Sequence, residues 1–451
     1  MFAGKTIVAF AVAMLTVAAF VAAAAASSPE ERAREAAGWL VNEQYQALWD
    51  ASTTVMQKRA SVEDWKTKAG PAVKAFGKLI EFGPAKVSQA GGNTIVTLPA
   101  KFENAAVDFT VSVDAEGKIA GLFLRPHGEQ ATAYQRPAYV KPESFTERDV
   151  TVGDGEWKLP GTLLLPKSAQ TASRVPAVVL AHGSGPNDRD ETISGNKPFK
   201  DLAEGLASQG IAVLRYDKRT KVYGAQIAGL KQFTVKEETI DDAVQAVALI
   251  EKQPEIDPKR VFVLGHSLGG YLLPMILEST PDARGGIALA GSTRPLEDIM
   301  VEQYEELIPE QTAGGSEELK QKGQATLEQA RQARAAIKAL DPSKIDGPPL
   351  LYAPPSYWLA LAGYNPPARA VKFSMPLLIL QGERDYQVKM TEFTNWKAAL
   401  GSKPNVTLKS YLALNHLFIE GTGKSTPEEY NHPGHVSAEV ISDISKWIAG
   451  H

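Results

Sequence analysis

Three residues that could serve as nucleophile, acid and base lie far apart in the chain. Ser267 lies in Gly265-His-Ser-Leu-Gly269, directly after the apolar run 261–264 and before a helical stretch. A serine on such a sharp turn needs small neighbours, and the first N–H groups of the helix can face a developing oxyanion. The sequence predicts that Ser267 is a nucleophile, with a plain glycine-rich turn as the alternative.

A serine needs a base and an orienting acid, which on this kind of turn follow in the order acid, then histidine. Asp385 follows the apolar run 375–380, and His416 follows the run 406–412, ahead of the last helical stretch. Each candidate therefore falls at the carboxyl end of a different strand, where open α/β sheets assemble their sites. The alternatives are Glu383 or Asp298 as the acid and His432 or His435 as the base.

A second oxyanion donor is expected from the loop after an earlier strand. His182-Gly-Ser-Gly-Pro186 follows the run 175–181, so the backbone N–H of Ser184 is predicted to lie opposite that of Leu268. His182 precedes the nucleophile and is interpreted as structural. The charged segments 187–190 and 217–219 are interpreted as ion pairs that brace the site loops, although perturbed catalytic groups are the alternative.

Strands and helices alternate from about residue 146 to the end of the chain. Apolar runs rich in β-branched residues predict buried strands, and this alternation indicates a mostly parallel sheet covered on both faces. Residues 296–370 interrupt the alternation with a polar helical stretch and then a segment rich in proline and aromatic residues. We expect a helical cap here, whose Tyr357 and Trp358 contact the substrate; ordinary packing of these aromatic residues is the alternative.

The region before residue 146 has a different organisation. Helical periodicity over 29–53 and 62–80 is followed by alternating, strand-like segments at 94–100, 105–113 and 118–124. This order predicts a small α+β domain over 29–125, joined by a proline-containing linker at 126–145 to a domain over 146–451.

Residues 1–26 have the composition of a secretory signal. A lysine near the start precedes an uncharged, alanine-rich stretch that ends at Ser27. Cleavage near Ala26 would give a secreted or periplasmic protein without stable membrane insertion. An uncleaved N-terminal anchor, with the protein still outside the cytoplasm, is the alternative.

Composition excludes several classes of function. The chain has 451 residues, 48 basic against 52 acidic side chains and a net charge of −4, which argues against nucleic acid as a partner. It has no cysteine, so disulfides and thiolate chemistry are absent. Its seven histidines lack the paired helical spacing of a zinc peptidase, and no phosphate-binding glycine motif occurs. No metal or cofactor is therefore expected.

Taken together, these motifs make residues 146–451 resemble an α/β-hydrolase. The chain is similar to secreted bacterial esterases and dienelactone-hydrolase-like enzymes that carry a small N-terminal domain, here resembling the cystatin (NTF2-like) fold. The resemblance implies that Ser267, Asp385 and His416 form the catalytic triad, and that the Ser184 and Leu268 N–H groups form the oxyanion hole. One departure is Thr220, where relatives often have glycine; it affects only the local turn.

The expected fold is therefore an α/β-hydrolase with a doubly wound, mostly parallel sheet, a helical cap insertion at 296–370 and a small α+β domain in front. The expected function is cleavage of a small-molecule carboxylic ester through a Ser-His-Asp triad and an acyl-enzyme. A peptidase or thioesterase using the same triad is the runner-up. A non-catalytic binding protein that has kept the fold is the remaining alternative.

Overall fold

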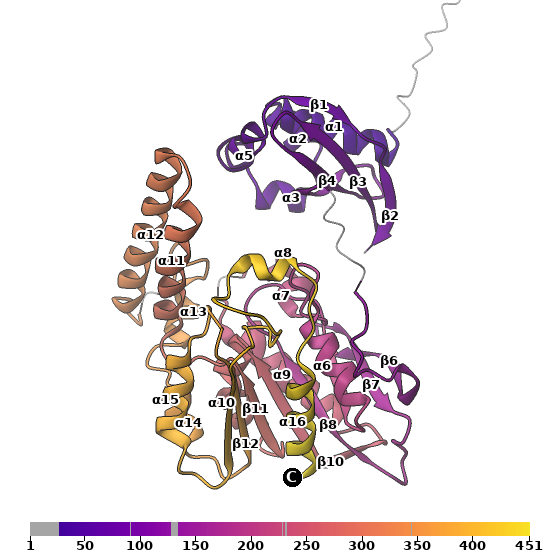
Figure 1. Ribbon diagram of the computed structural model, residues 1–451, viewed down its shortest axis with the longest axis vertical. Helices are drawn as coiled ribbons and strands as arrows, with labels where there is room; N and C mark the ends of the chain where they lie inside the picture. The colour runs from indigo at the N-terminus through magenta and orange to yellow at the C-terminus, as the bar shows by residue number, and fades with distance from the viewer. Residues whose placement is uncertain (1–26, 91, 128–133, 228, 231, 344) are drawn as a thin grey trace, which may run out of the picture. The chain divides into compact units, whose positions relative to one another are not determined.

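The computed structural model describes residues 27–451 except residues 91, 128–133, 228, 231 and 344 (Figure 1). The chain divides into two compact units, residues 1–130 and 131–451. The predicted signal, residues 1–26, lies outside the described residues. Within the described part of the chain, no helix has the length and apolar character that crossing a membrane requires.

The first unit packs short helices against an antiparallel sheet. Its helices are α1 (Pro29–Val41), α2 (Tyr45–Asp50), α3 (Thr54–Arg59), α4 (Val62–Asp64), the π-helical turn η1 (Trp65–Ala69) and α5 (Gly70–Ala75). Its strands are β1 (Leu79–Phe82), β2 (Lys86–Ala90), β3 (Asn93–Phe102), β4 (Ala106–Val113) and β5 (Ile119–Pro126). They pair in the order β1-β3-β4-β5, with β2 also on β3.

The alternating pattern of β3 and β4 explains how this sheet forms. Val96, Leu98, Phe109 and Val111 are buried against the helices, while the residues between them are only partly buried. Period-two burial of this kind is what a sheet covered on one face requires. This buried face, together with α1 and α2, makes up the core of the unit.

Two expectations for this unit are wrong in detail. The helix predicted over 29–53 is broken, because Glu43 has a φ of 59° between α1 and α2. The helical stretch predicted to reach residue 80 ends at Ala75, after which Gly77 adopts a φ of 81°. A glycine in this conformation is a common helix terminator. The residues that follow form strand β1.

The second unit is built on an eight-stranded sheet with the order β13-β12-β11-β10-β8-β9-β7-β6. Strands β8 to β13 run parallel to one another, whereas β7 is antiparallel to both of its neighbours, β9 and β6. This confirms the predicted mostly parallel sheet. The strands are β6 (Phe145–Val152), β7 (Leu159–Pro166), β8 (Val175–Ala181), β9 (Ala212–Tyr216), β10 (Ile256–His266), β11 (Gly285–Leu289), β12 (Leu377–Gly382) and β13 (Val406–Tyr411).

Helices cover both faces of this sheet. One face is covered by α9 (Asp241–Ile250), α10 (Leu268–Ser279) and α15 (Met390–Leu400), and the other by α6 (Pro198–Ala207) and α16 (Ala438–Ala449). The short helices α7 (Arg219–Val222) and α8 (Gly224–Ile227) follow β9. Shorter turns are η2 (Pro142–Ser144), η3 (Lys236–Ile240) and η4 (Pro427–Asn431). Between β11 and β12 the chain inserts α11 (Leu296–Thr312), α12 (Glu317–Lys338), α13 (Pro355–Ala360) and α14 (Pro366–Ala370). In Figure 1, α11 and α12 stand as a pair of long helices beyond one end of the sheet.

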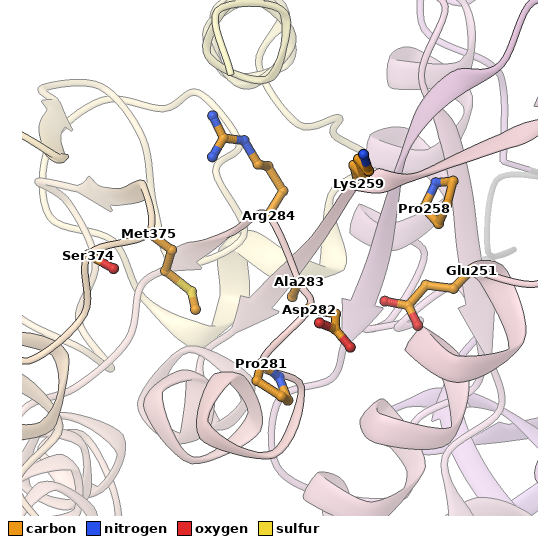
Figure 2. A pocket seen from close by; sticks show the side chains of 9 residues that line it. All are labelled: Glu251, Pro258, Lys259, Pro281, Asp282, Ala283, Arg284, Ser374 and Met375. Carbon is orange, nitrogen blue, oxygen red and sulfur yellow. The ribbon is translucent and has the colours of Figure 1, made fainter.

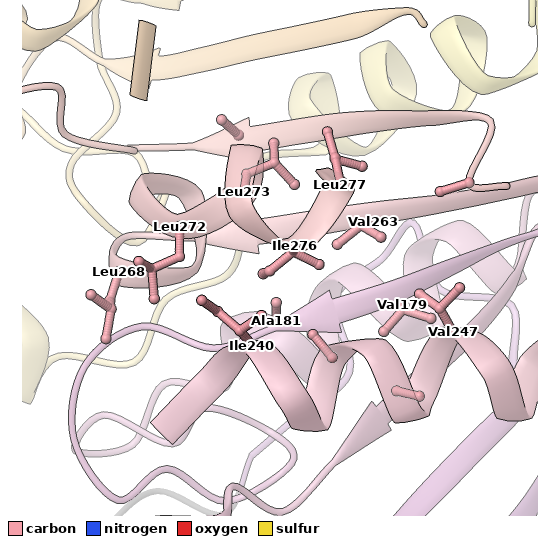
Figure 3. Close-up of a cluster of buried hydrophobic side chains, with 14 of the residues drawn as sticks. Val179, Ala181, Ile240, Val247, Val263, Leu268, Leu272, Leu273, Ile276 and Leu277 are labelled. Carbon is pink, nitrogen blue, oxygen red and sulfur yellow. The ribbon is translucent and has the colours of Figure 1, made fainter. Parts of the chain in front are cut away.

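Strand β8 shows why every residue of a central strand is apolar. Val179 and Ala181 pack with α9 and α10 on one face, as Figure 3 shows, while Val178 and Leu180 pack with α6 and α16 on the other. Burial on both faces removes the polar alternation of an exposed sheet. The two cores hold the parallel strands in place, so that their carboxyl ends lie along one edge.

Candidate active site

The turn at Ser267 joins β10 directly to α10. Ser267 has a φ of 52° and a ψ of −112°, a strained conformation for a residue other than glycine. A Cβ atom on Gly265 would lie 2.2 Å from the Gly269 carbonyl oxygen, and one on Gly269 would lie 2.2 Å from the Ala181 carbonyl oxygen. Neither distance is tolerable, so the close approach of three backbone segments explains the glycine spacing around the serine.

Asp385 and His416 are in direct contact. His416 Nδ1 lies 2.6 Å from Asp385 Oδ2, and the two residues are only 3% and 5% exposed. The other carboxylate oxygen accepts hydrogen bonds from the backbone N–H groups of Gln387 at 2.8 Å and Val388 at 2.9 Å. The carboxylate is therefore fixed in orientation. Because a carboxylate only accepts, the contact places a proton on His416 Nδ1 and leaves Nε2 as the basic atom of the neutral ring.

The residue before the serine connects the nucleophile turn to the histidine loop. His266 Nε2 lies 3.0 Å from the His416 carbonyl oxygen, and the two imidazole ring centroids are 4.8 Å apart. Ser267 is thus the immediate neighbour of a residue that touches the main chain of His416. Strands β10, β12 and β13 bring the three predicted triad residues to the same edge of the sheet.

The alternative acids and bases either have other partners or face solvent. Glu383 accepts a hydrogen bond from Ser410 at 2.8 Å, and Asp298 pairs with Lys338 at 2.7 Å. His435 lies 3.2 Å from Asp201. His432 is exposed. Each of these residues is engaged elsewhere or turned to solvent.

The loop after β8 lies against the nucleophile. A Cβ atom on Gly183 would lie 3.2 Å from the Ser267 Cβ, so the backbone of this loop approaches the serine closely. The Gly183 N–H donates to Glu191 Oε1 at 2.6 Å, which occupies that donor. The next donor along the loop is the N–H of Ser184. Leu268 is the first residue of α10, where backbone N–H groups lack partners within the helix.

Glu191 and His266 form a buried pair that the sequence analysis missed. Glu191 Oε2 lies 2.9 Å from His266 Nδ1, and Glu191 has a φ of 51°. Burial alone would lower the pKa of His266, but the Glu191 carboxylate offsets it and the pKa is raised. Burial likewise opposes the charge on Glu191, yet the pKa of this carboxyl is lowered by His266. The carboxylate on one side of the ring and the carbonyl on the other both favour the charged form of His266.

The other polar groups near the loop are paired as predicted. Arg189 binds Asp217 at 2.9 Å, and Lys218 binds Glu238 at 2.6 Å. Burial lowers the pKa of His182 to about 4, so this histidine is neutral at neutral pH. Its ring packs between Phe199 and Tyr216. This packing agrees with the structural interpretation of His182.

Tyr357 and Trp358 lie on α13 and are buried. The Tyr357 hydroxyl donates to Glu238 Oε2 at 2.7 Å, and Trp358 Nε1 donates to the Leu350 carbonyl oxygen at 2.8 Å. Both side chains join the core on the α10 side of the sheet. Their polar atoms are therefore engaged by the protein, and their predicted contact with substrate stays a prediction.

A groove of about 560 Å³ lies at the other edge of the sheet (Figure 2). Its lining includes Lys259 near the start of β10, Arg284 just before β11 and Met375 shortly before β12. These are the amino ends of the strands, whereas Ser267 follows a carboxyl end. The groove is therefore separate from the candidate active site. Within the described ranges, no group of three or more histidine, aspartate or glutamate side chains could hold a metal ion.

The sheet order, the serine turn and the Asp385–His416 contact together define an α/β-hydrolase. The family model described as serine aminopeptidase, S33, matches residues 176–421, and the chain belongs to this family of hydrolases. A second model, a protein family of unknown function called DUF3887, matches residues 33–122. The small N-terminal unit thus has relatives of its own.

Individual relatives carry both esterase and peptidase names. Esterase EstD of Thermotoga maritima is 40% identical over 354 residues, covering 78% of this chain and 79% of the relative. The protein named uncharacterized peptidase YuxL of Bacillus subtilis is 30% identical over 122 residues, covering 27% of this chain and 18% of the relative. Among solved structures, Est1E from Butyrivibrio proteoclasticus is 16% identical, with a TM-score of 0.42 over 67% of this chain and 99% of that one.

Proposed function

We propose that this hydrolase cleaves carboxylic esters of small molecules through a covalent acyl-enzyme on Ser267. The observation that carries the proposal is the 2.6 Å contact between His416 Nδ1 and Asp385 Oδ2, at the sheet edge that also holds the strained Ser267 turn. The name of the Thermotoga relative, an esterase, supports the ester as substrate. No cofactor or metal is required for this chemistry.

In the first half of the reaction, Ser267 Oγ attacks the acyl carbon while His416 Nε2 takes its proton. Asp385 holds the imidazole tautomer and stabilises the imidazolium. The backbone N–H groups of Ser184 and Leu268 stabilise the oxyanion of the tetrahedral intermediate. When the intermediate collapses, the alcohol leaves with the proton from His416. Water then attacks the acyl-enzyme by the same route and releases the acid.

A peptidase is the second candidate, because the family model and the Bacillus relative are both named for peptidases. The same triad also serves thioesters. Purified protein assayed on p-nitrophenyl esters of increasing acyl length, aminoacyl p-nitroanilides and acyl-thioesters separates these activities. The highest kcat/KM is expected on an ester. A highest value on an anilide or a thioester would replace the ester assignment, and no turnover on any of them would favour a binding protein.

The insertion 296–370 is proposed to act as a cap over Ser267, with Tyr357 and Trp358 forming part of the acyl pocket. Support comes from its position, since it leaves the sheet after β11 and returns before β12. A cap of this kind excludes water and limits acyl length.

Export to the periplasm or the medium is proposed from the signal-like residues 1–26, with an uncleaved anchor as the alternative. Mature protein is then expected to begin near Ser27. N-terminal sequencing that finds Met1 in a membrane fraction would favour the anchor.

A further inference from the structure

The peptide unit between Gly183 and Ser184 carries two groups with opposite directions. In a trans peptide the carbonyl of one residue and the N–H of the next point away from each other. Whatever holds the Gly183 carbonyl therefore also sets the direction of the Ser184 N–H. This is the N–H that the proposed function assigns to the oxyanion hole.

A buried lysine holds this carbonyl. Lys218 is only 1% exposed, and its Nζ donates to the Gly183 carbonyl oxygen at 2.7 Å. Asn187 Nδ2 approaches the same oxygen at 3.2 Å. Glu191 fixes the N–H on the other side of Gly183. Hydrogen bonds thus fix both the N–H and the carbonyl of Gly183.

Lys218 is bound by Glu238, which is bound in turn by Tyr357 of the insertion. Its Nζ donates to Glu238 Oε1 at 2.6 Å, and the hydroxyl of Tyr357 donates to Glu238 Oε2 at 2.7 Å. Burial raises the pKa of the Tyr357 hydroxyl, with the Glu238 carboxylate adding to the effect, so the hydroxyl keeps its proton and remains a donor. A continuous set of contacts joins helix α13 of the insertion to the loop after β8.

The neighbouring cation provides a contrast. Arg219 is also buried, but its Nε donates to Asp242 at 3.0 Å and its guanidinium lies 5.4 Å from the centre of the Trp157 ring. Both residues therefore place a buried positive charge, paired with a carboxylate, in this segment of the chain. Only Lys218 of this pair binds the loop beside Ser267.

We propose that Lys218 is a positioning residue that directs the Ser184 N–H at the oxyanion, and that Glu238 and Tyr357 hold Lys218 in place. The ammonium also withdraws electron density from the Gly183 carbonyl, which makes the N–H of the same peptide a stronger donor. This inference rests on the proposed function. It also links the insertion to the loop after β8, because the contacts run from the Tyr357 hydroxyl through Glu238 and Lys218 to the Gly183 carbonyl.

The test compares full-length Lys218→Met with the matched control Arg219→Met. Loss of one oxyanion donor lowers kcat by about 10²–10³-fold, so misdirecting the donor should lower kcat by roughly tenfold to hundredfold. KM should change little, because the bound ester has no oxyanion. Affinity for a trifluoromethyl ketone, which forms an oxyanion on serine, should fall in parallel with kcat. Arg219→Met should lower the melting temperature and leave kcat unchanged.

Tyr357→Phe and Glu238→Gln keep the proposal testable if Lys218→Met does not fold. Tyr357→Phe keeps the ring and removes one hydrogen bond, so a roughly threefold to tenfold loss in both kcat and ketone affinity is expected. Variants whose kcat and ketone affinity stay within about twofold of the wild type, or that change KM alone, would overturn the role of Lys218. Wild-type protein that neither hydrolyses p-nitrophenyl esters nor reacts with a fluorophosphonate at Ser267 would instead overturn the proposed function.

Discussion

Replacing Asp385 with asparagine tests the proposed base without changing the shape of the site. In the wild type, Oδ1 of Asp385 accepts from two backbone N–H groups, while Oδ2 accepts from His416 Nδ1 and from Gln381 Nε2 at 3.1 Å. An asparagine can satisfy the two backbone donors only with its oxygen. Its amino group must then face His416 and the Gln381 amide, and that orientation has a chemical consequence.

An amino group facing His416 Nδ1 can only donate, so the imidazole must accept there and carry its proton on Nε2. In that tautomer Nε2 cannot take the proton of Ser267. We expect Asp385→Asn to lower kcat by about 10⁴-fold, as expected when a triad histidine is held in the wrong tautomer. The amino group also opposes the Gln381 amide, and the lost hydrogen bond should destabilise the fold by about 1–3 kcal/mol.

The assay is steady-state hydrolysis of a p-nitrophenyl ester, with circular dichroism and thermal unfolding to show that the variant is folded. Glu383→Gln is the matched control, because this nearby carboxylate contacts Ser410 and should leave kcat within about twofold of the wild type, as expected for an exposed residue that contacts no reacting group. A folded Asp385→Asn variant with kcat within about tenfold of the wild type would refute the assignment of Asp385 as the residue that orients His416.

Three further predictions concern the surroundings of the site. Glu191→Gln should destabilise the protein by about 3–5 kcal/mol, because it leaves the charge of His266 unpaired. The lowered pKa of Glu191 contributes its full stability only above the ordinary value of 4.5, and the raised pKa of His266 contributes its full stability only below the ordinary value of 6.5. The difference in unfolding free energy from the wild type should therefore be largest between pH 4.5 and 6.5. A difference independent of pH would contradict this charge pair. Gly269→Ala should abolish folding or destabilise by about 3 kcal/mol or more, because its Cβ would lie 2.2 Å from the Ala181 carbonyl oxygen; unchanged thermal unfolding would rule out the close approach. Trp358→Ala should change the ratio of kcat/KM between short and long acyl esters by about tenfold, whereas a lower melting temperature with the same acyl preference would show that Trp358 only packs.

The parts of the site that follow strand ends could be predicted from the sequence. The stretches 261–264 before Ser267 and 377–380 before Asp385 are entirely apolar because β10 and β12 are buried on both faces of the sheet, whereas β13, the edge strand before His416, alternates apolar and polar residues. Parallel strands with short connections bring their carboxyl ends to one edge, so residues far apart in the chain could be expected together. The glycines around Ser267 give a second local signal, since their spacing reflects backbone contacts.

The supporting residues could not be predicted in the same way. Tyr357 of the insertion donates to Glu238 in η3, and Glu191 in the loop after β8 contacts His266 at the end of β10. Each contact depends on how two separate segments pack, and neither leaves a periodic pattern in the sequence. One signal was available for Glu191, because it directly follows the charged segment 187–190.

Reaction of the wild-type protein with a fluorophosphonate, followed by peptide mass spectrometry, tests the central claim most directly. A single adduct is expected on the peptide that contains Ser267, with loss of esterase activity in proportion to labelling. Ser267→Ala should be folded, unlabelled and lower in kcat by several orders of magnitude. An adduct on a different serine, or ester hydrolysis that persists after Ser267 is fully modified, would contradict the account.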